Sequence, residues 1–125
     1  MDKTMTQNAV SPGMELIVAE RKRQIEKEGW STDHDDKYKD GELAKAGSCY
    51  EHAFNEKASL SHQWPWALKW WKPKDRVSNL VRAGALYLAE AEKQERKNEA
   101  MKADHWKARA EIMGTEIDLL KKKST

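Results

Sequence analysis

The chain has 125 residues, of which 38% are hydrophobic and 35% are charged, and its formal net charge is +2. This length fits one domain, and no apolar run comes near the roughly 20 residues that a bilayer requires. The first ten residues lack the layout of a signal peptide, and the single cysteine, Cys49, cannot form an intrachain disulfide. We therefore expect a protein of the cytoplasm with no membrane partner.

The first predicted helix covers residues 11–29. Residues 1–10 are polar and unpatterned, so we expect a flexible tail ahead of a single helical domain that spans residues 11–125. Ser11 and Pro12 are typical of a helix N-cap and first turn, and Gly29 is typical of a helix end. Residues 30–39 are polar and acidic and predict a loop.

A second helix is predicted to begin with Asp40 as its cap, and the small residues at 44, 46, 47 and 53 would let another helix approach closely. A tryptophan-rich connection follows over residues 58–73, where Pro65 and Pro73 interrupt helix. Pro73 could equally open the next helix. From residue 75 onward a helical stripe is formed by Val77, Leu80, Val81, Gly84, Leu88 and Ala91.

The last segment carries apolar side chains at spacings of three and four residues. They are Ala103, Trp106, Ala110, Met113, Ile117 and Leu120. This is the seam of a short coiled coil, and it is too short to be stable alone. It could pack on the chain's own body or join copies into a homo-oligomer through residues 103–120. Because no segment alternates like a strand, the predicted fold is all-α, a small bundle of three to four helices with a heptad-patterned C-terminal helix at 99–125.

The first candidate site is an acidic cluster of Glu20, Glu28, His34, Asp35, Asp36 and Glu42. Four of its carboxylates form a candidate metal site: Glu20, Asp35, Asp36 and Glu42. Glu20 lies in the first helix and Glu42 in the first turn of the second, so antiparallel pairing would bring them together. Mg²⁺ and Mn²⁺ prefer such oxygen ligands. The segment 33–36 also fits a solvated turn, and this interpretation is favoured because the spacing is not that of a fixed metal motif.

A basic and aromatic segment is the second candidate. Residues 64–82 hold four tryptophans and five basic residues. They lie in the basic second half of the chain, which follows an acidic first half. Indole faces can stack on a base, and Lys and Arg can hold phosphate. The candidate ligand-binding residues are Trp64, Trp66, Trp70, Lys72, Lys74, Arg76 and Arg82. Alternatively, at least two of the indoles form the core. The net charge of +2 argues against a nucleic-acid partner.

The segments 20-ERKRQIEKEGWSTDHDDKYKDGELAKAGSCY-50 and 64-WPWALKWWKPKDRVSNLVRAGALYLAEAEK-93 resemble a family of short uncharacterised proteins that phages and prophages of bacteria encode. The resemblance implies a family core at 11–98 and residence in a bacterial host cell. Members carry Asp where this chain has Asn79; if that Asp ligates metal, its replacement argues against metal chemistry here. A looser similarity is to the all-α MazG-like nucleotide pyrophosphohydrolases, but their paired ExxE and ExxD spacing is absent.

Three functions are compatible with these patterns. The first is a phage-encoded accessory protein that binds a nucleotide-like or phosphate-bearing ligand in a Trp/Lys/Arg pocket, and that sequesters it or inhibits a host factor such as a defence protein. The second is a nucleotide pyrophosphohydrolase that uses Mg²⁺. The third is an inhibitor that contacts a host protein through tryptophan hot spots and takes no small ligand. The first is favoured because no complete catalytic constellation is visible, and it requires no cofactor.

Overall fold

The structure is a computed structural model, and it describes residues 10–29 and 35–123. The helices of these residues are α1 (Pro12–Glu28), α3 (Glu42–Glu51), α4 (Arg76–Arg96) and α5 (Ala100–Lys123), with a short 3₁₀ turn η1 (Leu68–Trp70). No strand occurs among them, which confirms the predicted all-α bundle. The predicted tail, apart from Val10, and residues 30–34 of the predicted loop lie outside the described residues.

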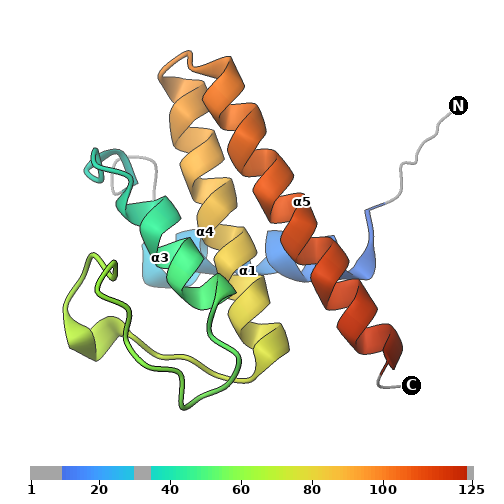
Figure 1. Cartoon of the computed structure of the whole chain (residues 1–125). Coiled ribbons are helices and arrows are strands. Elements are labelled where there is room, and N and C mark those ends of the chain that lie inside the picture. The colour runs from blue at the N-terminus through green and yellow to red at the C-terminus, as the bar shows by residue number, and fades with distance from the viewer. Residues whose placement is uncertain (1–9, 30–34, 124–125) are drawn as a thin grey trace, which may run out of the picture.

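An antiparallel hairpin of α4 and α5 forms the centre of the fold (Figure 1). α1 packs across both helices of the hairpin, and α3 packs on α4. The hairpin turn places Asn98 at a φ of 60°, in the left-handed region that asparagine tolerates better than most residues. The long segment between α3 and α4 winds outside the bundle and carries η1 (Figure 1).

The ends of α1 are those predicted from the sequence. The Ser11 hydroxyl accepts the backbone N–H of Met14 at 3.2 Å, and Pro12 opens the first turn. Gly29 ends the helix at a φ of 71° and donates its N–H to the carbonyl of Gln24. Local capping chemistry is therefore sufficient to define this helix.

The predicted starts of the next two helices need correction. Gly41, not Asp40, is the N-cap of α3, because the carboxylate of Glu42 turns back and accepts the Asp40 N–H at 2.8 Å. α4 begins at Arg76 with Asp75 as its N-cap, so Pro73 belongs to the preceding loop and does not open the helix. In both cases the helix begins later in the sequence than the pattern at Asp40 or Pro73 indicated.

The heptad seam of α5 packs on the chain's own body. Ala103, Ala110, Met113 and Ile117 are buried in the core, and the Trp106 ring stacks on Tyr87 with centroids 5.4 Å apart. At the crossing with α1, a Cβ on Gly13 would lie 2.3 Å from the carbonyl oxygen of Gly114. Since this seam is filled from within, residues 103–120 do not offer it to a second copy in this conformation.

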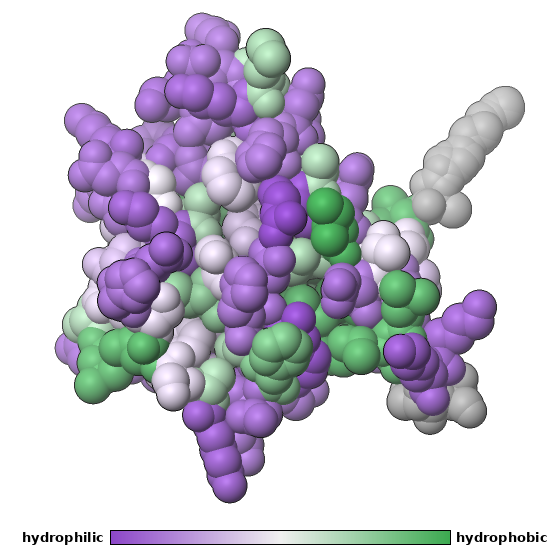
Figure 2. Space-filling model, viewed as in Figure 1, coloured by the Kyte–Doolittle hydropathy of each residue, from purple (hydrophilic) through white to green (hydrophobic). Residues whose placement is uncertain are grey.

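The surface is mainly hydrophilic over the hairpin end of α4 and α5, while apolar atoms gather over the loop after α3 and beside α5 (Figure 2). The exposed apolar side chains include Leu68, Trp70, Ile112 and Leu119. Among the described residues, no helix combines the length and the apolar character that crossing a membrane would demand.

Candidate functional site

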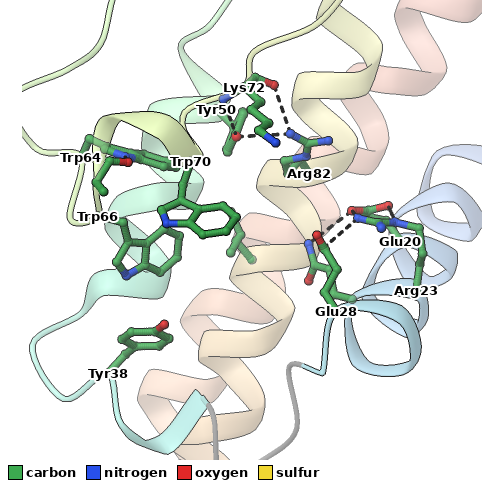
Figure 3. A pocket seen from close by; sticks show the side chains of 13 residues that line it. Glu20, Arg23, Glu28, Tyr38, Tyr50, Trp64, Trp66, Trp70, Lys72 and Arg82 are labelled. Carbon is green, nitrogen blue, oxygen red and sulfur yellow. Dashed lines mark hydrogen bonds and ion pairs between the residues drawn. The ribbon is translucent and has the colours of Figure 1, made fainter.

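A pocket of about 630 Å³ lies between α1, α4 and the tryptophan-rich loop (Figure 3). It is lined by Glu20, Arg23, Gln24 and Glu28 of α1, by Tyr38 and Tyr50, by Trp64, Trp66, Ala67, Trp70 and Lys72 of the loop, and by Arg82 and Leu86 of α4. The pocket thus joins segments that are up to 66 positions apart in the sequence. Its volume is within the range of about 300–1,000 Å³ that is usual for small-molecule sites.

Five of the predicted ligand-binding residues line this pocket: Trp64, Trp66, Trp70, Lys72 and Arg82. The other two, Lys74 and Arg76, do not. Arg76 donates through Nη1 to the carbonyls of Glu51 (2.5 Å) and Ala53 (3.1 Å), so it satisfies acceptors at the C-terminal end of α3. Lys74 is exposed, and its backbone is fixed by Asn79. The sequence pattern grouped these two cations with the other candidate ligand-binding residues, and the structure places them outside this pocket.

The tryptophans divide between a supporting cluster and one open ring. Trp64 makes edge-to-face contacts with Tyr50 and Trp66, and Trp71 packs behind it against both Trp64 and Tyr50. These three indoles are partly buried against the core. Trp70 differs, because 56% of its surface is exposed. The packing interpretation is therefore confirmed for three rings, and Trp70 is the one whose indole is exposed.

Lys69 and Lys72 lie near the exposed indole, and Arg82 lines the same pocket. The Nζ atoms of Lys69 and Lys72 lie 5.3 and 5.9 Å from the centre of the Trp70 ring. Arg82 is held by hydrogen bonds from its Nη1 to the Tyr50 hydroxyl (3.2 Å) and to the Lys72 carbonyl (3.1 Å). Within the described part of the chain, none of these cations forms an ion pair with a carboxylate. The corner is consequently positive and has donors to offer an anion.

The α1 wall carries charges that are already paired. Arg23 donates two hydrogen bonds of 2.8 Å to the Glu20 carboxylate and one of 3.1 Å to Glu28. Burial raises the pKa of Glu20, but the hydrogen bond and charge of Arg23, with the charge of Arg82, bring it below its ordinary value. Glu20 is thus anionic near neutral pH, and the charge of Arg23 is shared with Glu20 and Glu28.

Gln24 lies in the same wall and is only 1% exposed. Its amide nitrogen donates to Glu20 at 3.4 Å, while its Oε1 has no hydrogen-bond partner among the described residues. The orientation of the amide follows from Glu20, since turning it round would place two acceptors together. A residue of the pocket wall therefore carries a buried acceptor that lacks a donor among the described residues.

The four candidate metal ligands do not converge. Asp35 is fully buried against Arg21 at 2.6 Å, and the exposed Asp36 binds Arg96 at 2.7 Å. Glu20 binds Arg23, and Glu42 accepts the Asp40 N–H. Of the four, only Glu20 lines the pocket, and no group of three His, Cys, Asp or Glu side chains in the described ranges could hold a metal ion. Each of the four carboxylates binds a different cation or backbone N–H, so the four do not form one metal site. His34 lies outside the described residues.

Six pocket residues were missed by the sequence analysis: Arg23, Gln24, Tyr38, Tyr50, Ala67 and Leu86. A signal for part of this set existed, because residues 20, 24 and 28 follow one another at helical spacing and share one face of α1. Nothing local indicates that this face meets the tryptophan loop. Cys49 is buried, and burial raises the pKa of its thiol despite a hydrogen bond from Ser61, so it lacks the character of a nucleophile.

Comparisons of the chain with protein-family models, with curated proteins and with solved structures find no match. They neither confirm nor refute the resemblance to short phage proteins. The functional argument is therefore built on the chemistry of the pocket.

Proposed function

We propose that the chain binds a nucleotide-like ligand with a phosphate group in this pocket, and that it works as a binding protein rather than an enzyme. The observation that carries the proposal is that two cations without carboxylate partners among the described residues, Lys72 and Arg82, line the same pocket as the exposed indole of Trp70. An exposed indole supplies a stacking surface for a base, and adjacent Lys and Arg supply charge-assisted hydrogen bonds to phosphate.

The supporting cluster favours a preformed site. Trp64, Trp71 and Tyr50 pack on one another, and the Tyr50 hydroxyl accepts from Arg82 and from the Lys72 backbone N–H. The Arg82 side chain and the backbone of Lys72 are thereby fixed to the aromatic wall before a ligand arrives, which lowers the ordering cost of binding.

A hydrolase is less well supported. Two carboxylates line the pocket, Glu20 and Glu28, and both are bound to Arg23. The other predicted ligands, Asp35, Asp36 and Glu42, do not line it. With the phage resemblance, binding alone suggests an accessory protein of a bacterial host cell that sequesters its ligand or blocks a host factor that needs it, as a counter-defence protein would.

The proposal is tested by calorimetric titration with nucleoside mono-, di- and cyclic phosphates and with the matching nucleosides. We expect a phosphate-bearing member to bind at least tenfold more tightly than its nucleoside. Trp70→Ala and Lys72→Ala should each weaken binding about tenfold, corresponding to roughly 1.4 kcal/mol. Lys74→Ala is the matched control, because Lys74 is a nearby lysine outside the pocket, and it should not change the affinity. Flat titrations across the panel would refute the proposal.

A protein partner is the second candidate, favoured by one observation. Leu68 and Trp70 are 66% and 56% exposed on the same 3₁₀ turn. Such a pair is typical of an interface anchor. If a host protein binds here, Leu68→Ser should abolish its capture from lysate, and it should leave nucleotide affinity unchanged because Leu68 does not line the pocket.

A further inference from the structure

The pocket has two chemically different ends. Its cations without carboxylate partners, Lys72 and Arg82, belong to the loop and α4, whereas the α1 wall offers acceptors. Figure 3 shows the side chains of Glu20 and Glu28 on the opposite side of the view from the tryptophans. A ligand that satisfies both ends must carry an anionic group at one end and N–H donors at the other.

Gln24 makes the second requirement specific. Gln24 lines the pocket, and its Oε1 is buried and lacks a donor within the described residues. A buried acceptor without a donor costs free energy that a ligand N–H can recover. Its neighbour Glu20 stays ionised and fixes the amide so that oxygen, not nitrogen, remains available.

Glu28 adds an acceptor at the same end. Its Oε2 accepts from Arg23 at 3.1 Å, and the side chain is 41% exposed. An ionised carboxylate has about four acceptor positions, so a single bond to Arg23 does not saturate it. The acceptors of α1 therefore come from two side chains one helical turn apart.

We infer that the pocket selects a nucleobase that carries an exocyclic amino group, with Gln24 Oε1 and Glu28 accepting its N–H bonds while the base stacks on Trp70. This inference rests on the proposed function and adds the identity of the base class. A base that presents only carbonyl oxygens to this wall would place its acceptors against those of Gln24 and Glu28. Acceptors left without donors in this way weaken binding strongly.

The test uses two ligand pairs that differ only in the amino group: GMP against IMP, and AMP against purine riboside 5′-monophosphate. Calorimetry on the full chain should show, for whichever pair binds, at least fivefold tighter binding of the member that carries the amino group. Gln24→Leu removes the unpartnered oxygen together with one long hydrogen bond to Glu20 and should fold. In this variant the ratio should fall, because one of the two acceptors is lost, while phosphate-dependent binding persists.

Each result has one meaning. Equal binding of both members by the unaltered chain would overturn the selection of amino bases and leave the nucleotide site standing. A ratio that survives Gln24→Leu, measured beside circular dichroism spectra that match, would overturn the role of Gln24. If no phosphate-bearing ligand binds at all, the proposed function fails and this inference fails with it.

Discussion

Arg76 and Arg82 are two α4 residues of the same type with different roles. Arg76 donates to backbone carbonyls at the end of α3, whereas Arg82 faces the pocket and donates to Tyr50 and the Lys72 carbonyl. Both lie in a basic, tryptophan-rich stretch, so composition could not separate them. The position of α3 separates them. The carbonyls at its C-terminal end need donors, and of these two arginines Arg76 is the one that reaches them.

Asn79, in the first turn of α4, binds the loop that precedes this helix. Its amide nitrogen donates to the carbonyls of Ala53 (2.9 Å) and Lys74 (2.8 Å), and its oxygen accepts the Lys74 N–H at 2.7 Å. The side chain is 1% exposed, so these bonds form away from water. The sequence comparison with phage proteins treated this position only as a lost metal ligand, whereas the structure shows an amide with both ends in use.

We therefore predict that Asn79→Asp destabilises the fold by about 3 kcal/mol near neutral pH, because an anion would lose both donor bonds and face two carbonyls in a buried place. The loss should diminish in acid, since a protonated carboxyl can donate again. Urea unfolding at several pH values measures both effects. Asn55→Asp is the matched control: Asn55 is exposed and uses only its oxygen, toward the Lys57 N–H, so it should be neutral. Equal stability of the two variants would contradict this account.

At the scale of the elements, one carboxylate joins three helices. Glu51, at the end of α3, accepts hydrogen bonds from Arg109 of α5 at 2.5 and 2.6 Å and from the Tyr87 hydroxyl of α4 at 2.6 Å. Burial raises the pKa of Glu51, but the hydrogen bonds from Arg109 and Tyr87 and the charge of Arg109 outweigh it and lower the pKa below its ordinary 4.5. Burial and the Glu51 carboxylate raise the pKa of Tyr87.

The sign of the pH dependence follows from that lowered pKa. The unfolded chain binds the Glu51 proton more tightly than the folded chain, so the carboxylate stabilises the fold above about pH 4.5, and this contribution is lost as the pH falls through the folded pKa. Glu51→Gln should lower the free energy of unfolding by about 1–2 kcal/mol near neutral pH, and the difference from the unaltered chain should shrink below about pH 4.

Glu95→Gln provides the matched control for this prediction. Glu95 pairs with Lys107 at 2.6 Å, but both side chains are nearly half exposed, and exposed pairs contribute little. Thermal unfolding followed by circular dichroism should show no measurable change for Glu95→Gln at any pH. A Glu51→Gln penalty that stays constant between neutral pH and pH 3 would show that packing, not ionisation, explains the role of Glu51.

The elements differ in how well the sequence predicted them, and capping explains the difference. α1 was predicted at both ends because Ser11 and Gly29 act within one turn of themselves. The N-cap of α3 was predicted one residue early, at Asp40 instead of Gly41. For α4 the sequence left two starts open, and the structure has the start near residue 75 and not the one at Pro73. The α5 seam was predicted residue by residue from its spacing, but spacing cannot say what covers a seam, and the choice between self-packing and oligomer required the fold.

At the scale of the molecule, the site is harder to predict than the fold because it is assembled from distant segments. The tryptophans and two of the cations were found from local composition. The α1 wall was missed, because its approach to the loop depends on where α1 crosses the α4–α5 hairpin. That crossing is set by buried side chains such as Ile17 and by the contact of Gly13 with Gly114, none of which carries a functional signal.

The same long-range dependence predicts that α5, although it lines no part of the pocket, is required for it. α5 places Ala103, Ala110, Met113 and Ile117 in the core, and its Asp118 accepts the Gly13 N–H at 2.7 Å. Burial of each large apolar side chain contributes about 1.5–3 kcal/mol, against a total stability of about 5–15 kcal/mol for a domain. A chain of residues 10–98 should therefore fail to fold cooperatively and should lose the ligand affinity described above.

Truncation tests this with a close control. A chain ending at residue 120 keeps the whole seam and Asp118, and it should unfold in one sharp thermal transition like the full protein. The chain ending at residue 98 should show a broad, shallow transition and collapsed amide dispersion in proton NMR spectra. If it instead melts sharply and binds the nucleotide with unchanged affinity, the pocket segments hold together without α5, and the hairpin is not the frame on which α1 meets the tryptophan loop.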